Sequence, residues 1–155
     1  MPNNVEINFD LSGLEQLKEN LGQKINAKVG VLGDSASREG GEENNATIGA
    51  THEFGSFTKN IPQRSFLKMP IAENSDKLTQ SINFEEELTR KEGVKNIFEK
   101  MAVNAVAIVQ TAFETGGYGK WQPLSNQTIK KKKSASILID TAQLRKSITY
   151  RVDNE

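Results

Sequence analysis

The sequence predicts an α+β domain, with a small, mainly antiparallel sheet packed on one long central helix and shorter peripheral helices. Between residues 93 and 115, apolar residues recur every three or four positions, which is the spacing of one helix face over about six turns. Several short segments instead alternate apolar and polar residues, as half-buried strands do. At 155 residues and 35% hydrophobic content, the chain suits one domain, residues 1–155, with a modest core.

Short elements are expected before the long helix. Alternation predicts strands at residues 5–11 and 25–31, with a short helix between them that ends at Gly22. Ser12 and Glu15 match a capping box at the start of that helix. The two strands could lie side by side in one sheet.

The region from residue 35 to residue 87 should alternate between loops and helices. Residues 35–45 contain no large apolar side chain, so they cannot offset the entropy of ordering and are predicted to form a mobile loop. A helix is expected over residues 46–54, and a second helix after Ser65, which is a plausible cap. Residues 85–87 are predicted to be an acidic, solvated linker.

The long helix should provide most of the core and should end at Gly116 and Gly117, where the missing Cβ atoms permit left-handed backbone. A basic loop is predicted at about residues 126–136. It is followed by a short helix through Leu144, capped by Asp140 or Thr141, and by a final strand with Ile148, Tyr150 and Val152 on one face. The helix residues predicted to be largely buried are Ile97, Met101, Val106, Val109 and Phe113.

The composition excludes several common kinds of active site and metal site. The chain has no cysteine and one histidine, His52, so disulfides, thiol catalysis, a His-Glu-x-x-His zinc site and a conventional catalytic triad are excluded. The Gly-rich stretch 116–120 follows a helix, whereas a phosphate-binding loop precedes one. We therefore expect no enzyme, no cofactor and no metal. No apolar run approaches the length of a membrane span and no signal pattern is visible, so a soluble protein made in the cytoplasm is expected.

The charges are balanced in total but not along the chain. Lys plus Arg and Asp plus Glu number 20 each, yet from Tyr118 onward eight residues are basic and three are acidic. This asymmetry would help copies join head to tail, or it is ordinary surface variation. The run Lys130, Lys131, Lys132 and Lys133 could contact phosphates or an acidic neighbour, or it is a solvated surface.

Three groups of segments together resemble a known family. They are residues 48–55 (IGATHEFG) with 61–67 (IPQRSFL), residues 121–125 (WQPLS) with Thr128, and residues 138–148 (LIDTAQLRKSI). In this order they are similar to motifs of tailed-phage virion morphogenesis proteins, a group that includes Mu-type morphogenesis and head–tail joining, neck or tail-completion proteins. Two positions depart from the pattern, since Ala142 stands where Gly is usual and Ser65 where Pro is common.

The resemblance implies a structural protein of the head–tail junction that forms a homo-oligomeric ring around the DNA channel. It would contact other connector and tail proteins, and it could also contact DNA non-specifically in the channel. It would be found in the virion, and in the host cytoplasm during assembly. A nucleic-acid-binding accessory protein that uses the lysine run is the alternative; a small hydrolase lacks a recognisable site.

The motif residues also suggest packing roles. Phe54 should tuck inward where Gly55 reverses the chain, and Arg64 offers a planar donor fork for a carboxylate across an interface, beside the apolar Phe66. Trp121 should fix the loop that leaves the long helix. Candidate subunit or partner contacts are therefore Phe54, Arg64, Phe66 and Trp121.

Overall fold

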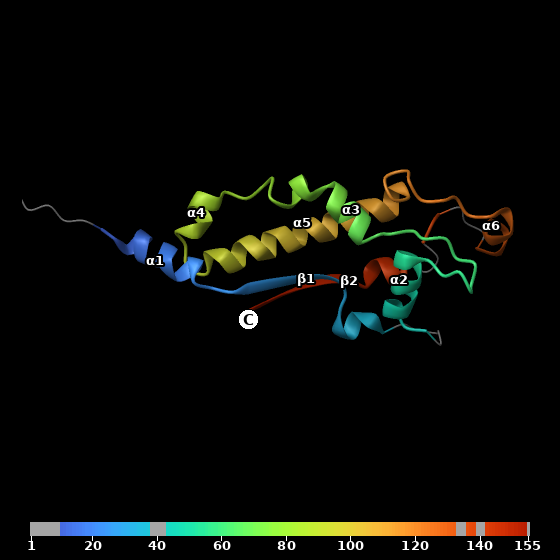
Figure 1. Ribbon diagram of the computed structural model, residues 1–155, viewed down its shortest axis with the longest axis horizontal. Helices are drawn as coiled ribbons and strands as arrows, with labels where there is room; N and C mark the ends of the chain where they lie inside the picture. Colours follow the sequence, from blue (N-terminus) through green and yellow to red (C-terminus); the bar gives the residue numbers. More distant parts are fainter. Residues whose placement is uncertain (1–9, 38–42, 133–135, 139–141, 155) are drawn as a thin grey trace, which may run out of the picture.

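The structure, a computed structural model, describes residues 10–37, 43–132, 136–138 and 142–154. Its centre is a long helix, α5 (Gly93–Thr115), packed against an antiparallel pair of strands, β1 (Ile25–Val31) and β2 (Ile148–Asn154). Figure 1 shows an elongated molecule in which α5 and the strands run side by side and shorter helices lie around them. The predicted α+β fold is confirmed.

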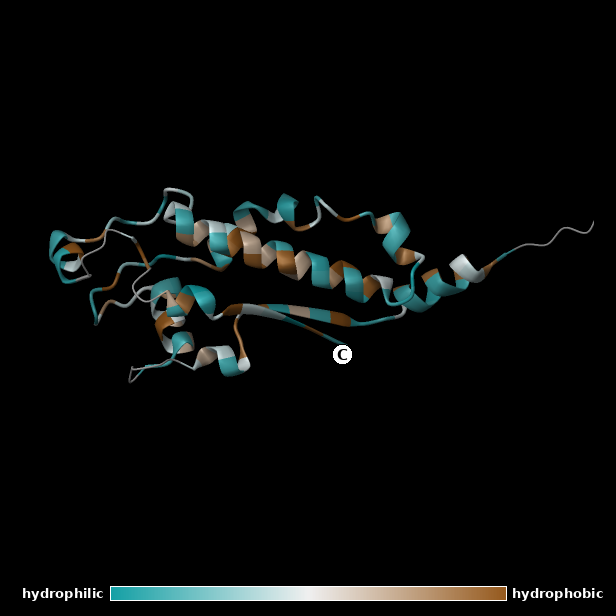
Figure 2. Ribbon diagram, turned by 180° about the vertical axis from the view of Figure 1, so that it is seen from behind, coloured by the Kyte–Doolittle hydropathy of each residue, from teal (hydrophilic) through white to brown (hydrophobic). Residues whose placement is uncertain are grey.

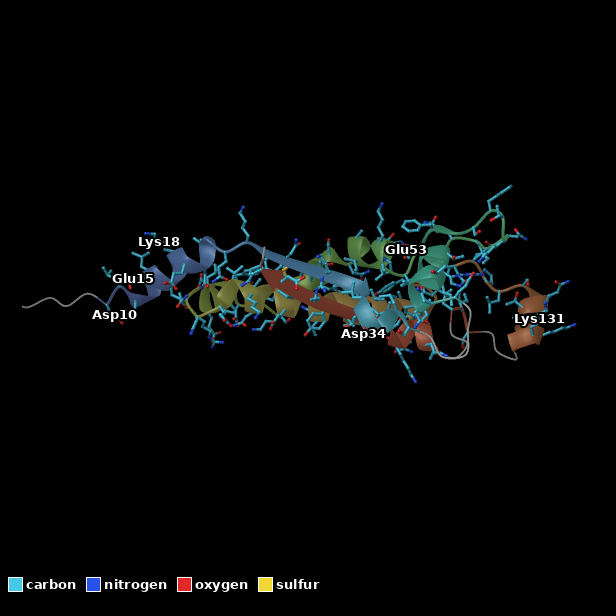
Figure 3. The ribbon with its side chains drawn as sticks, turned by 90° about the horizontal axis from the view of Figure 1, so that it is seen from below. Asp10, Glu15, Lys18, Asp34, Glu53 and Lys131 are labelled. Atoms are coloured by element: carbon cyan, nitrogen blue, oxygen red, sulfur yellow. The ribbon has the colours of Figure 1, made fainter. Side chains whose placement is uncertain are left out.

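The register of the sheet explains which of its faces is covered. Ile25 pairs with Asn154 and Val31 pairs with Ile148, so residues opposite one another share a face of the sheet. Val31 and Ile148 pack into the core against α5, whereas Lys28 lies opposite Arg151 on the other face. From below, both strands lie in front of α5 (Figure 3).

The strand predicted at residues 5–11 falls almost entirely outside the described residues. Within them, β1 is paired with β2 instead. The strand predicted from Ile148 onward is confirmed, although Tyr150 is exposed at its middle.

Helix α5 provides the core, as predicted. Hydrophobic residues recur along the length of α5 (Figure 2). The buried ones gather where its C-terminal half meets the sheet and the segments that follow it. The central cluster comprises Phe66, Val109, Ala112, Phe113, Trp121, Leu144 and Ile148. Of the five predicted core residues, Ile97, Val109 and Phe113 are buried. Met101 and Val106 are only half-buried, which corrects the prediction for these two. The helix ends at Gly116, whose φ of 61° is left-handed, as expected.

The remaining elements are short. They are α1 (Ser12–Leu21), η1 (Gly33–Ala36), α2 (Asn45–Phe54), α3 (Lys68–Glu73), η2 (Ser75–Leu78), α4 (Phe84–Leu88), α6 (Asn126–Lys132) and α7 (Gln143–Lys146). In the part of the chain that the structure describes, no helix combines the length and the apolar character needed to cross a membrane.

Two predicted loops contain helices. The acidic linker at 85–87 lies within α4, because the Asn83 side chain accepts a hydrogen bond from the backbone N of Glu86 and starts the helix. The basic loop at 126–136 is helical as far as Lys132.

The predicted mobile loop at 35–45 has structured ends. Residues up to Ala36 belong to η1, and Asn45 begins α2, where its buried amide donates to the backbone oxygen of Ser37 at 2.8 Å. The middle, residues 38–42, lies outside the described residues, so the mobility of this segment stays a prediction.

Helix α1 begins differently from the prediction. The backbone N of Ser12 donates to Asp10 Oδ1 at 3.0 Å, so the acceptor at this end is Asp10 and the predicted Ser12–Glu15 capping box is wrong. At its other end, the buried Asn20 amide donates to the backbone oxygens of Leu88 and Arg90, at 2.7 and 2.8 Å. Asn20 thereby joins α1 to the turn that precedes α5.

Candidate assembly groove

The motif segments, which are far apart in the sequence, line one groove. It lies beyond the C-terminal end of α5, between α2, α6 and α7, and has a volume of about 860 Å³. We call it the assembly groove. Its lining comes from residues 48–64 (Ile48, His52, Phe54–Phe57, Asn60–Arg64), from residues 122–128 (Gln122–Ser125 and Thr128) and from residues 138–144 (Leu138 and Ala142–Leu144).

A buried carboxylate that the sequence analysis missed organises one wall of the groove. Glu53, in the last turn of α2, accepts hydrogen bonds from the backbone N atoms of residues 66, 67 and 68 at 2.8, 3.0 and 3.1 Å. It also accepts one from Ser65 Oγ at 2.6 Å. Backbone N–H groups at the start of a helix have no acceptor within the helix and are stabilised by a negatively charged group. Because the Glu53 carboxylate accepts their hydrogen bonds, it fixes the turn into α3. The sequence feature that could have indicated this role is a glutamate beside the Phe-Gly end of one helix, shortly before the start of a second helix.

Ser65 does not occupy the N-cap position of α3, which is Leu67, but it binds a backbone N–H group of the first turn of that helix. Its hydroxyl accepts a hydrogen bond from the backbone N of Met69 at 2.9 Å while it donates to Glu53. A proline at this position, as is common in the resembling family, would make neither contact.

Arg64 supports the groove from inside the molecule. Its side chain is buried, and its Nε donates to the backbone oxygen of Gln122 at 3.1 Å, with Nη2 at 3.5 Å from that of Pro123. Burial lowers the pKa of the Arg64 guanidinium from its ordinary value. The prediction that Arg64 reaches a carboxylate on a neighbour is corrected, because the guanidinium is enclosed and holds the 122–123 loop of its own chain.

Trp121 and Phe66 do not line the groove but belong to the core cluster, each within two residues of a residue that does. The Trp121 indole Nε1 donates to the backbone oxygen of Ser65 at 3.0 Å, and its ring meets Phe113 edge-on at 5.9 Å between ring centroids. Phe66 packs on the other side of Phe113 at 5.2 Å. Gly117, at a φ of 69°, lies directly under the indole, where a Cβ would overlap it. Both aromatic residues are buried in their own chain, which corrects their assignment as partner contacts, while the predicted role of Trp121 in fixing its loop agrees with these contacts.

Phe54 points outward rather than inward. Its side chain is 73% exposed, and Phe57 in the following turn is fully exposed. Glu53 occupies the inward position at this end of α2, and the next helical residue is rotated by about 100°, so Phe54 must face away. Phe54 therefore remains a candidate contact residue, and Phe57 is one that the sequence analysis missed.

The lysine run lies beside the groove on α6. Lys130 and Lys131 are exposed, Lys132 is the last residue of the helix, and Lys133 lies outside the described residues. The start of α6 is held by Ser125, whose hydroxyl accepts a hydrogen bond from the backbone N of Thr128 at 3.2 Å. Since Ser125 and Thr128 also line the groove, α6 presents its lysines next to it.

Ala142 lines the groove in a strained conformation. Its φ of 59° and ψ of 9° are left-handed, which costs a residue with a Cβ about 1–2 kcal/mol relative to glycine. This is the position at which the resembling family usually has glycine.

We expect Ala142→Gly to raise the free energy of unfolding by about 1 kcal/mol, because the strain outweighs the added freedom of the unfolded chain. Ala107→Gly, on the exposed side of α5, is the matched control and should lower it by about 1 kcal/mol. Chemical denaturation of both variants measures the difference. A loss of stability in Ala142→Gly would contradict the strain.

A second cluster of charges lies where α4 meets α5. Glu87 was expected to be solvated, but it is buried and its Oε1 accepts a hydrogen bond from Lys100 Nζ at 2.6 Å. Arg90 Nη1 lies 3.6 Å from the same oxygen. The hydrogen bond from Lys100 is the main cause that lowers the pKa of Glu87 from its usual 4.5, and it outweighs the opposing effect of burial.

The lowered pKa makes a definite prediction for acid stability. A carboxylate whose pKa falls on folding stabilises the protein above its unfolded pKa and loses this contribution as pH falls through the folded pKa. Glu87→Gln should therefore be less stable than the natural protein near neutral pH, with the difference shrinking below the usual pKa of 4.5. Glu85→Gln, which removes an exposed carboxylate from the same helix, is the matched control. Urea unfolding between pH 3 and pH 7 tests both variants.

Comparison of the chain with protein-family models, with curated proteins and with solved structures finds no match. The resemblance of the motif segments to tailed-phage virion morphogenesis proteins therefore stays a prediction. What the structure adds is the position of these segments, which line one groove and the walls that support it.

Proposed function

We propose that this protein is a structural component of the head–tail junction of a tailed phage, of the neck or tail-completion type. It assembles as a homo-oligomeric ring around the DNA channel and joins the capsid connector to the tail. The observation that carries the proposal is the convergence of the three motif groups, residues 48–67, 121–128 and 138–148, on the assembly groove. A concave site of this size is the natural first candidate for a binding site.

The construction of the groove is consistent with protein–protein contact. The segments around it are tied together, because the side chains of Glu53, Arg64 and Trp121 each hydrogen-bond to backbone groups of another segment. Its rim exposes Phe54 and Phe57, and large aromatic side chains exposed beside a preformed depression are typical of interaction sites. In this proposal the protein acts through assembly rather than catalysis, and its partners are other copies and the neighbouring connector and tail proteins.

Electron microscopy of the purified protein tests the ring directly. Discrete rings of uniform size are expected for the natural sequence. Phe57→Ser should reduce ring formation, because it removes an apolar contact without touching the core, whereas Phe84→Ser, at an exposed phenylalanine of α4, is the matched control and should leave the rings intact. A protein that stays monomeric at all concentrations would contradict the proposal.

Particle assembly tests the place of the ring. Phage particles produced with the Phe57→Ser protein should accumulate as filled heads and separate tails. The Phe84→Ser protein should give joined particles. Normal particles from both variants would show that the groove has no role at the junction.

A second candidate function is non-specific binding of nucleic acid by α6. Lys130 and Lys131 are exposed, and residues 121–132 contain no acidic residue. Binding of this kind weakens steeply with salt, by a slope of about 0.9 per phosphate contact on double-stranded DNA. Replacing both lysines by glutamine should lower that slope by about 2 in a gel-shift titration. Binding that is absent at low salt, or a slope that does not change in the variant, would exclude this function.

A further inference from the structure

The first helix projects from the body of the molecule. In Figure 1, α1 extends beyond the N-terminal end of α5, at the end of the molecule opposite to α6. Its attachment is the buried Asn20 in its last turn, while residues 10–15 are all exposed. We call residues 10–21 the arm.

The arm carries an apolar stripe that nothing covers within the described residues. Leu11, Leu14 and Leu21 lie on one side of the helix at steps of three and seven positions, and they are 56, 62 and 68% exposed. Helices shorter than about 12–15 residues are marginal in water without tertiary packing. A helix of ten residues with its leucines in solvent is therefore suited to packing against another surface.

The opposite end of the molecule offers a surface of matching character. Phe54 and Phe57 are exposed on the rim of the assembly groove, and Lys130 and Lys131 lie beside it on α6. The rim of the groove therefore offers exposed apolar side chains, and the adjoining helix α6 offers exposed lysines.

The charges of the two ends are complementary. The arm carries three acidic residues, Asp10, Glu15 and Glu19, and one lysine, whereas residues 121–132 carry three lysines and no acidic residue. Figure 3 labels Asp10 and Glu15 at one end of the molecule and Lys131 at the other. An arm brought to the groove of a second molecule would bring its carboxylates near these lysines.

We propose that the arm of one copy docks in the assembly groove of the next copy, with its leucines against Phe54 and Phe57 and its carboxylates toward Lys130 and Lys131. The arm cannot reach its own groove while Asn20 is anchored beside α5, because the two lie at opposite ends of the molecule. The contact is therefore head to tail, and such contacts close into rings when the rotation between copies permits. This inference rests on the proposed function and names the interface that builds its ring.

Cysteine cross-linking tests the contact, since the natural chain contains no cysteine. The double variant Leu14→Cys/Phe57→Cys should form disulfide-linked multimers under mild oxidation, because each arm reaches a neighbouring groove. The matched control Leu14→Cys/Val103→Cys places the second cysteine at an exposed apolar position of α5 and should not form that ladder. Equal cross-linking in both variants, or none in either, would overturn the proposal.

Mixing two single variants tests the head-to-tail arrangement. Leu14→Asp has a defective arm and an intact groove, and Phe57→Asp has the reverse, so each alone should self-associate about tenfold or more weakly than the natural protein. A mixture should form a one-to-one heterodimer that does not grow further, measured by sedimentation velocity. Both residues are exposed, and circular dichroism of each variant should match that of the natural protein. If Leu14→Asp alone disrupts assembly and Phe57→Asp does not, the arms pair with each other and the proposal is wrong.

The outcomes separate this inference from the proposed function. If the natural protein forms rings but the Leu14→Cys/Phe57→Cys variant does not cross-link, the ring function stands and the arm contact is overturned. Cross-linked chains or heterodimers without discrete rings would support the arm contact and contradict the ring.

Discussion

Glu53→Ala is expected to lower the free energy of unfolding by about 3–5 kcal/mol, because four hydrogen-bond donors lose one shared, charged acceptor. The donors at residues 66–68 are backbone N–H groups in a partly buried turn, where water replaces the carboxylate poorly. The turn into α3 should loosen, and the Trp121 indole, which donates to the Ser65 backbone oxygen in this turn, should lose its partner. Urea denaturation followed by circular dichroism measures the loss at a fixed protein concentration.

Glu53→Gln is the sharper variant, since it keeps the shape of the side chain. Its amide offers one accepting oxygen and turns an NH₂ group toward backbone donors, so we expect a loss of about 2–4 kcal/mol. Glu85→Ala, at an exposed position of α4, controls for the removal of a glutamate side chain and should change stability by less than about 0.5 kcal/mol. A Glu53 variant as stable as this control would show that the four contacts contribute nothing net.

Phe113→Ala should also remove about 3–5 kcal/mol, because the ring is enclosed between Phe66 and Trp121. The variant leaves a cavity in the core cluster, and the two remaining aromatic rings lose their common neighbour. Phe98→Ala provides an internal comparison on the same helix. Phe98 is only half-buried, so its loss should cost about 1–2 kcal/mol.

The ratio of these two losses is the informative quantity. Periodicity places both phenylalanines among the apolar residues of α5, but only the C-terminal half of the helix lies beneath the aromatic cluster. Equal losses in denaturation midpoint for the two variants would mean that the cluster adds no packing beyond that of an ordinary helix face.

The parts of the fold that could be predicted from the sequence are those governed by local periodicity. Helix α5 and strand β1 follow directly from the spacing of their apolar residues, and Gly116 ends α5 as expected. The sheet pairing could not be derived in this way, because alternation indicates a strand but not its partner. Runs of acidic and basic residues predict loops at α4 and α6, whereas the side chains of Asn83 and Ser125 begin short helices there.

The sequence motifs indicate which segments lie at or next to the groove, but not which of their side chains are buried and which are exposed. Arg64, Phe66 and Trp121 were selected as partner contacts, yet all three are buried and hold the groove together. Residue type could not separate the two roles, since an Arg beside aromatic residues suits an interface and an interior equally well. The contacts that decide between them, such as that from Arg64 to the Gln122 backbone oxygen, join segments whose proximity no local pattern encodes.

The pairing of β1 with β2 has a consequence for how the chain folds. Residues 32–147 lie between the two strands, so the sheet cannot form until all of α5 and all of the groove segments have been synthesised. A helix can form within microseconds, whereas contacts at this separation must first overcome the entropy of closing a long loop. Chains that end before Ile148 should therefore expose the apolar face of α5 and aggregate, and refolding of the whole chain should be limited by the arrival of β2.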